Sequence, residues 1–317
     1  MTLGLNRREA LMKTGAVLSG AVLGSAASAE PIQASPSAQV QLGRLERWAP
    51  FPSRAVPPRP VEVWLPLGYD GQRPHAVLYM HDGQMLFYPR STWNGQAWKV
   101  DQVAAPLIAA GQLRDFIVVG IWNRPEFRHA EFFPQAYDHA LQDSPTAQRY
   151  RAERIKHQVM SDAYLRFIVE ELKPAVDARY ATAPGRESTF LMGSSMGGMI
   201  SVYGLCEYPQ VFGAAAALST HWIGSFERNR EIPAAALAYL RRKLPPPGQL
   251  RLYMDRGTVD LDAQYDDAQA QVDALMAELG HRAPQLQSRV FEGQGHKELA
   301  WFTRLAQPLS FLLGASA

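Results

Sequence analysis

Apolar residues recur along the chain at two spacings. Short apolar runs are typical of buried strands, whereas longer segments with an apolar residue at every third or fourth position are typical of helices. The two kinds of segment alternate along most of the chain, which predicts an α/β fold with a mostly parallel central sheet and helices on both faces. Strands are expected at residues 61–67, 76–80, 116–122, 189–192, 213–218, 250–254 and 286–291, and helices at 100–110, 162–179, 200–205, 266–279 and 299–313.

The first 29 residues have the composition of an export signal. Arg7 and Arg8 give a basic start, an apolar stretch follows at 16–23, and residues 27–29 have the small-residue spacing of a cleavage site. The apolar stretch is too short to span a bilayer. The paired arginines resemble a twin-arginine signal, although the residues that follow depart from that pattern, so an ordinary secretory signal is the alternative.

The expected organisation therefore has three parts. Residues 1–29 form the export signal, and residues 30–60, rich in Ala, Ser and Pro, form a linker and an irregular N-terminal segment. Residues 61–317 form one large α/β domain. A bacterial protein with this organisation is expected in the periplasm or outside the cell.

Charge and cysteine content restrict the partners. The chain has 32 basic and 30 acidic residues, and the first 29 residues hold three of the basic and one of the acidic residues. The remainder is balanced at 29 of each, which argues against nucleic acid as a partner. Cys206 is the only cysteine, so no intramolecular disulfide can form. The sequence carries no signal for an oligomeric state, and no membrane span is expected after the export signal.

Two segments interrupt the alternation of strands and helices. Residues 123–158 combine charged and aromatic side chains without a clear period, and residues 220–247 contain Trp222, Phe226 and three consecutive prolines. Each segment follows an expected strand, and open α/β sheets bind ligands at the carboxyl ends of their strands. We therefore expect both segments to form walls of a substrate pocket.

One expected strand breaks into the sequence Gly193-Ser194-Ser195-Met196-Gly197, and an apolar helix follows. This is the G-x-S-x-G pattern, in which a serine occupies a sharp strand-to-helix turn and small neighbours leave room for its strained backbone. The pattern also occurs by chance, but the flanking strand and helix favour a functional turn. Ser195 is the candidate nucleophile.

A serine nucleophile needs a base, and the base needs an orienting carboxylate. His296 follows an expected strand in a glycine-rich loop and is the candidate base. Asp255, Asp260 and Asp262 all lie in or near the loop after the preceding strand. Asp260 is favoured because it follows a glycine turn, from which a carboxylate can point back toward His296. Asp255 and Asp262 stay open as alternatives, and Asp262 could instead cap the next helix.

The carbonyl oxygen of a substrate gains negative charge during attack and needs two N–H donors. One is expected from Met196, directly after the nucleophile, and the other from the loop at residues 81–84. Because Gly83 permits an unusual turn, the N–H of Gln84 is the candidate, with that of Gly83 as the alternative. His81 is expected to be a hydrogen-bonded structural residue rather than a metal ligand.

These segments together resemble the "putative esterase" group of α/β-hydrolases. That group includes feruloyl and acetyl xylan esterases, S-formylglutathione hydrolases, trilactone siderophore esterases and mycolyltransferases. The resemblance runs from about residue 61 to the C-terminus with the motifs in family order. It rests on residues 79–87, 193–198, 257–260 and 295–296.

The resemblance implies an α/β-hydrolase catalytic domain with a catalytic triad. Ser195 would be the nucleophile, Asp260 the acid and His296 the base, and the Gly-Thr-x-Asp pattern that ends at Asp260 supports this choice of acid. The backbone N–H groups of Gln84 and Met196 would form the oxyanion hole.

The sequence therefore predicts an exported serine carboxylesterase that acts through an acyl-enzyme and needs no metal or organic cofactor. The expected substrate is a small-molecule or carbohydrate-linked ester, including feruloyl esters. A siderophore trilactone ester is an alternative, as is acyl transfer to an alcohol by the same triad. Trp93, Trp98, His221 and Trp222 are candidate substrate-binding residues because their rings offer a stacking surface, although they suit a hydrophobic core equally well.

Overall fold

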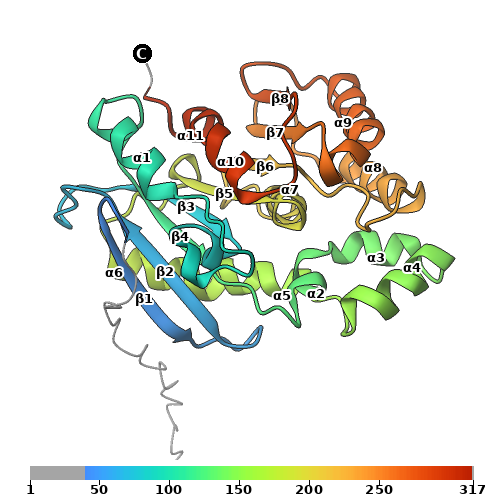
Figure 1. Ribbon diagram of the computed structural model, residues 1–317, viewed down its shortest axis with the longest axis horizontal. Coiled ribbons are helices and arrows are strands. Elements are labelled where there is room, and N and C mark those ends of the chain that lie inside the picture. The colour runs from blue at the N-terminus through green and yellow to red at the C-terminus, as the bar shows by residue number, and fades with distance from the viewer. Residues whose placement is uncertain (1–39, 316–317) are drawn as a thin grey trace, which may run out of the picture.

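Eight strands form one sheet in the order β1-β2-β4-β3-β5-β6-β7-β8 (Figure 1). The computed structural model describes residues 40–315, so the expected export signal lies outside the described residues. Strand β2 pairs antiparallel with β1 and β4. The other neighbours in this order, from β4-β3 through β7-β8, all pair in parallel, which confirms the predicted fold class. The strands are β1 Arg44–Phe51, β2 Arg59–Leu65, β3 Ala76–His81, β4 Phe116–Ile121, β5 Thr189–Ser194, β6 Ala214–Leu218, β7 Leu252–Gly257 and β8 Leu286–Phe291.

The central strands are apolar because helices cover both of their faces. Every residue of β3, β4, β5 and β6 is buried, and such strands appear in the sequence as unbroken apolar runs rather than as alternating patterns. Strand β1 was not expected, since residues 30–60 were predicted to be a linker and an irregular segment. It buries Leu45, Trp48 and Phe51, which are separated by Glu46-Arg47 and by Ala49-Pro50, so its sequence shows neither a long apolar run nor strict alternation.

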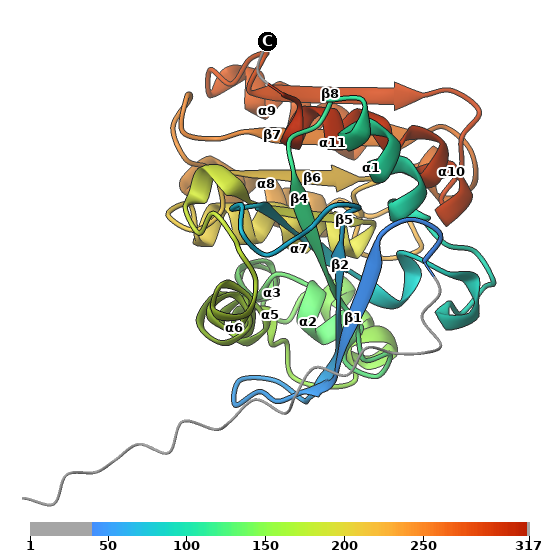
Figure 2. The same ribbon diagram turned by 90° about the vertical axis from the view of Figure 1, so that its left-hand side faces the viewer.

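Helices lie on both faces of the sheet. Helices α1, α10 and α11 lie together on one face (Figures 1 and 2), over side chains such as Leu78 and Met80. Helix α7 packs on β5 and β6 on the other face. No helix within residues 40–315 is long and apolar enough to cross a bilayer. The helices are α1 Val100–Ala109, α2 Arg128–Phe132, α3 Gln135–Leu141, α4 Pro145–Tyr150, α5 Ser161–Arg166, α6 Lys173–Arg179, α7 Met196–Glu207, α8 Glu231–Lys243, α9 Asp266–Glu278, α10 Glu298–Arg304 and α11 Ala306–Leu313, with π-helical segments at Arg151–Ile155 and Phe167–Leu172.

The two segments that lacked a clear period contain helices. Residues 123–158 form α2, α3, α4 and the first π-helical segment, and residues 220–247 contain α8. Helices of only five to seven residues are too short for a helical period to show in the sequence. Helices α3 and α8 lie side by side (Figure 1), with the rings of Tyr137 and Tyr239 5.5 Å apart.

Candidate active site

Ser195 lies on a strained turn between β5 and α7. Its backbone angles are φ 57° and ψ −122°, which a residue with a side chain rarely adopts. The turn is tight enough that a Cβ on Gly193 would lie 2.6 Å from the backbone of Gly197. The glycines of the motif are therefore required by close backbone contacts, and the turn holds Ser195 at the carboxyl edge of the sheet.

His296 and Asp262 form a hydrogen-bonded pair in this region. His296 follows β8, and its Nδ1 lies 2.6 Å from Oδ1 of Asp262, which belongs to the 3₁₀ turn Asp260–Gln264 after β7. The Asp262 side chain is fully buried, and that of His296 is 14% exposed. Burial alone raises the pKa of the Asp262 carboxyl, but hydrogen bonds and the charge of His296 outweigh it and hold this pKa below its usual value.

The structure corrects the predicted identity of the carboxylate beside His296. Asp260 was favoured from the sequence, but it is exposed and has a left-handed backbone with φ 55°. Its carboxylate lies against the backbone of Gly295, where a Cβ would meet it at 2.0 Å. Asp262 was one of the alternatives, and it bonds to His296 instead of capping α9.

Asp255, the other alternative, takes part in a buried network behind Asp262. Its Oδ1 accepts a hydrogen bond from Nη2 of Arg304 at 2.9 Å, and neither side chain is more than 1% exposed. The same Arg304 nitrogen donates to Oγ of Ser219, and Ser219 donates to Oδ2 of Asp262 at 2.6 Å. The backbone N–H of Gly257 also donates to this oxygen at 2.6 Å. Asp262 is thus fixed on one side while its Oδ1 faces His296.

The loop after β3 makes a tight turn, but its left-handed residue is not the one expected. Asp82, not Gly83, has the left-handed backbone, at φ 56°. Gly83 is needed because a Cβ there would lie 2.5 Å from the backbone of Gly120. The backbone N–H groups of Gln84 and Met196 donate to no acceptor within residues 40–315, so both are free to bind a substrate oxygen.

Asp82 is held by two partners that the sequence did not reveal. Arg128 donates from Nε and Nη2 to its two carboxylate oxygens at 2.8 and 2.7 Å, and Asn123 donates to Oδ1 at 2.6 Å. Burial acts to raise the pKa of Asp82, but the Arg128 charge and these hydrogen bonds lower it overall. His81 is buried, with Nδ1 2.8 Å from the hydroxyl of Tyr164, and desolvation lowers its pKa to about 4. It is a hydrogen-bonded structural residue, as expected.

Ser195 and His296 line one cavity of about 200 Å³, hereafter the Ser195 cavity. Tyr265 lies beside this cavity, because its hydroxyl is 2.5 Å from Nδ1 of His221, which lines the cavity. Burial keeps the pKa of His221 well below its usual value. Other residues of the wall include Asp82, Trp93, Asn94, Trp98, Arg128, His129, Phe226, Glu298 and Trp301.

Three of the four predicted aromatic contacts are in the wall of the Ser195 cavity. Trp93 is 59% exposed, and Trp98 and His221 are buried but line the cavity. Trp222 does not line it. The Trp222 side chain is fully buried, and its indole N–H donates to Oε1 of Gln269 at 2.8 Å, so this residue belongs to the core.

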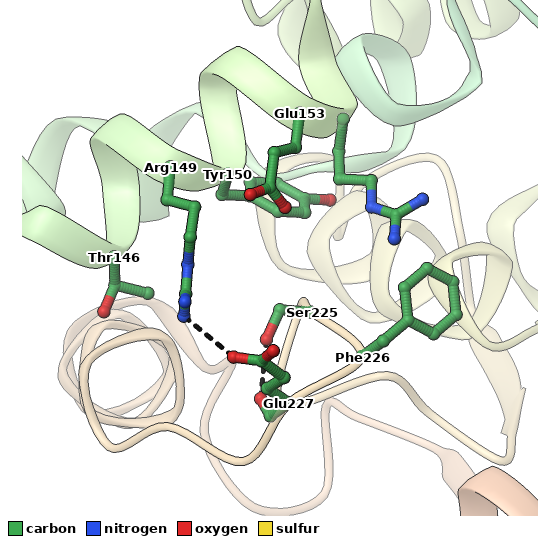
Figure 3. A pocket seen from close by; sticks show the side chains of 8 residues that line it. Thr146, Arg149, Tyr150, Glu153, Ser225, Phe226 and Glu227 are labelled. Carbon is green, nitrogen blue, oxygen red and sulfur yellow. Dashed lines mark hydrogen bonds and ion pairs between the residues drawn. The ribbon is translucent and has the colours of Figure 1, made fainter.

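A smaller cavity adjoins the Ser195 cavity, and Phe226 lines both (Figure 3). One wall comes from α4 and the π-helical segment, and the other from the loop that carries Phe226. Arg149 and Glu227 form an ion pair across it at 3.1 Å, and the Arg154 guanidinium lies 4.4 Å from the Phe226 ring centroid. An exposed ion pair of this kind contributes at most about 1 kcal/mol, so the two walls are only weakly joined. Residues of both irregular segments thus line the cavities, as expected.

Sequence reasoning missed Arg128, Tyr265, Glu298, Ser219 and Arg304. These residues belong to no recognisable motif. They lie near the site only because the tertiary fold brings their segments to the carboxyl edge of the sheet. For Arg128 there was one indirect signal, its place in a segment expected to form the pocket wall.

Comparisons with known proteins place this geometry in a family. The family model described as "Putative esterase" matches residues 56–312. The chain belongs to this family. It is therefore an enzyme that hydrolyses carboxylic esters, as the sequence predicted. No curated protein sequence matches the chain.

Solved structures show the same fold at low sequence identity. A ferulic acid esterase is 19% identical with a TM-score of 0.56, and the alignment covers 85% of this chain and 98% of that one. A ferulic acid esterase from Anaeromyces mucronatus, in complex with ferulic acid, is 17% identical with a TM-score of 0.59, over 87% and 93% of the two chains. The enterobactin esterase FES from Shigella flexneri is 18% identical with a TM-score of 0.55, over 89% of this chain. The alignment spans only 62% of the enterobactin esterase.

Proposed function

We propose that the protein is an exported serine carboxylesterase in which Ser195, His296 and Asp262 form the catalytic triad. The observation that carries the proposal is the Ser195 cavity. It combines a serine on a strained turn, an imidazole bonded to a buried carboxylate and the free N–H of Met196. The free N–H of Gln84 belongs to the loop between Asp82 and Met85, which also line the cavity. These are the parts that ester cleavage through an acyl-enzyme requires.

In the proposed reaction, Ser195 attacks the ester carbonyl while Nε2 of His296 accepts the hydroxyl proton. The N–H groups of Gln84 and Met196 stabilise the negative charge on the carbonyl oxygen. His296 then protonates the departing alcohol oxygen, which leaves the acyl group on Ser195. A water molecule that gives its proton to His296 hydrolyses this acyl-enzyme. Asp262 holds the imidazole with Nδ1 protonated throughout.

The substrate that we propose is an acyl ester of a carbohydrate, including feruloyl esters. The similarity to ferulic acid esterases supports this choice, and the similarity to enterobactin esterases supports a siderophore trilactone ester as the second candidate. Export is supported by the basic and apolar pattern of residues 1–29.

Hydrolysis of p-nitrophenyl acyl esters, feruloyl sugars and acetyl sugars by the mature protein tests the proposal. We expect turnover of short acyl esters by the wild type and a loss of at least about 10³-fold in Ser195→Ala. Ser310→Ala, an exposed position on α11, is the matched control and should keep wild-type activity. Undiminished turnover in Ser195→Ala would refute the assignment of the nucleophile.

A further inference from the structure

Glu298 places a carboxylate in the Ser195 cavity that the triad does not use. The residue is 4% exposed, lines the cavity and lies two positions after His296. Its Oε2 accepts a hydrogen bond from Nδ2 of Asn94 at 2.6 Å, and no other side chain within residues 40–315 bonds to this carboxylate. Removing a carboxylate from water is costly unless hydrogen bonds replace the lost hydration, and a ligand hydroxyl in the cavity can supply a further hydrogen bond to this carboxylate.

The loop that carries Asn94 holds its side chain in one orientation. Oδ1 of Asn94 accepts the backbone N–H of Gln96 at 3.0 Å, which directs the amide nitrogen to Glu298. Trp93, the preceding residue, also lines the cavity and leaves 59% of its surface exposed. The Arg128 guanidinium lies 5.9 Å from the Trp93 ring centroid. A flat aromatic ring and a fixed pair of polar groups therefore share one wall.

The reaction chemistry decides which half of the ester meets this wall. His296 delivers a proton to the departing alcohol, so the alcohol half must lie on the His296 side of the scissile bond. Glu298 begins α10 two residues after His296, and both side chains line the Ser195 cavity. The acyl carbonyl is directed instead toward the N–H groups of Gln84 and Met196. The wall that contains Glu298, Asn94 and Trp93 is therefore placed to contact the alcohol half of the ester.

We propose that Glu298, Asn94 and Trp93 form a subsite for the alcohol half of the ester and that this alcohol carries several hydroxyl groups, as a sugar does. Glu298 accepts a hydrogen bond from a hydroxyl next to the esterified one, Asn94 fixes the carboxylate, and the Trp93 ring covers the C–H face of the alcohol. A simple alkyl alcohol has no second hydroxyl to offer Glu298. The inference rests on the proposed function, because it assumes cleavage at Ser195.

A pair of esters with the same acyl group tests the subsite. We would measure kcat and KM for a methyl ester and for the xylose or arabinose ester of the same acid, with the wild type, Glu298→Gln and Trp93→Ala. We expect the wild type to favour the sugar ester in kcat/KM by at least about 10-fold. Glu298→Gln should lower kcat/KM for the sugar ester by about 10- to 100-fold, mainly through KM, since hydrogen bonds to charged groups have this strength. The loss on the methyl ester should be much smaller.

Glu292→Gln is the matched control, because it removes the same charge from an exposed position of the loop that precedes α10. It should leave the preference for the sugar ester intact. Trp93→Ala, at an exposed position that cannot affect folding strongly, should lower the preference in the same direction as Glu298→Gln. It therefore keeps the test valid if Glu298→Gln fails to fold.

Two results would overturn the subsite. One is a wild type that hydrolyses the methyl ester as well as the sugar ester. The other is a Glu298→Gln variant that loses activity equally on both esters with a shifted pH profile, which would mean that Glu298 acts through His296. Failure of the proposed function looks different, because then the wild type and Ser195→Ala would show the same activity on every ester.

Discussion

Replacing Asp262 by asparagine tests which carboxylate orients His296. Oδ2 of Asp262 accepts hydrogen bonds from the backbone N–H of Gly257 and from the hydroxyl of Ser219. The Gly257 N–H is a fixed donor, so the amide oxygen of the variant should take the Oδ2 position. The amide NH₂ then faces Nδ1 of His296. An NH₂ at this point favours the imidazole tautomer with the proton on Nε2, which cannot accept the proton of Ser195.

The expected loss of kcat is about 10³- to 10⁴-fold. The wrong tautomer removes general-base catalysis, while the oxyanion hole and substrate binding still operate. At 1.36 kcal/mol for each tenfold change in rate, this loss corresponds to about 4 to 5.5 kcal/mol of activation free energy. Asp260→Asn is the matched control. Asp260 is exposed and has a left-handed backbone, a conformation that asparagine tolerates well, so the control should stay within about 3-fold of wild type.

The assay is steady-state hydrolysis of a p-nitrophenyl ester by both variants, with thermal melting to show that each is folded. A folded Asp262→Asn variant with near-normal kcat would refute the pairing. A large loss of kcat in Asp260→Asn would also refute it, because the Asp260 carboxylate would then be the group that orients His296 during turnover.

The remaining predictions concern the loop that carries Gln84 and the buried histidine His81. Gly83→Ala would place a Cβ 2.5 Å from the backbone of Gly120, displace the Gln84 N–H and lower kcat by about 10²-fold. The same clash should lower the melting temperature. An unchanged kcat in the folded variant would exclude Gln84 as a donor. Buried His81 has its pKa lowered from 6.5 to about 4, so the folded state favours the neutral ring and stability present above pH 6.5 is lost as the pH falls toward 4. The loss from this residue is roughly 3 kcal/mol. Urea unfolding at pH 7 and pH 4.5 should show a smaller pH effect in His81→Asn, and an equal effect would contradict the assignment.

The sequence predicts the parts of this fold in which local pattern and burial agree. Strands such as β3 and β4 are buried on both faces and therefore appear as apolar runs. Strand β1 was missed because its buried Leu45, Trp48 and Phe51 are separated by Glu46-Arg47 and by Ala49-Pro50, which gives neither an apolar run nor strict alternation. The short helices α2 to α4 were missed because each is shorter than the window in which a helical period can be recognised.

The candidate site shows the same division between local and tertiary information. Ser195 was predictable because a sharp turn requires glycines at fixed positions beside it, and His296 because of its place after the last strand. The choice between Asp260 and Asp262 depends on the left-handed backbone at Asp260 and on the 3₁₀ turn that begins there. The sequence shows neither feature, and the two aspartates are only two residues apart. Trp222 was a reasonable candidate for stacking, but its hydrogen bond to Gln269 ties it into the core.

Covalent trapping shows directly which serine of the protein is the nucleophile. The mature protein would be treated with diethyl p-nitrophenyl phosphate, which phosphorylates activated serines, and the modified peptide mapped by mass spectrometry. The account predicts one diethylphosphoryl group on Ser195, formed in step with loss of esterase activity and absent from Ser195→Ala. A label on the neighbouring Ser194, or complete inactivation with Ser195 unmodified, would contradict it.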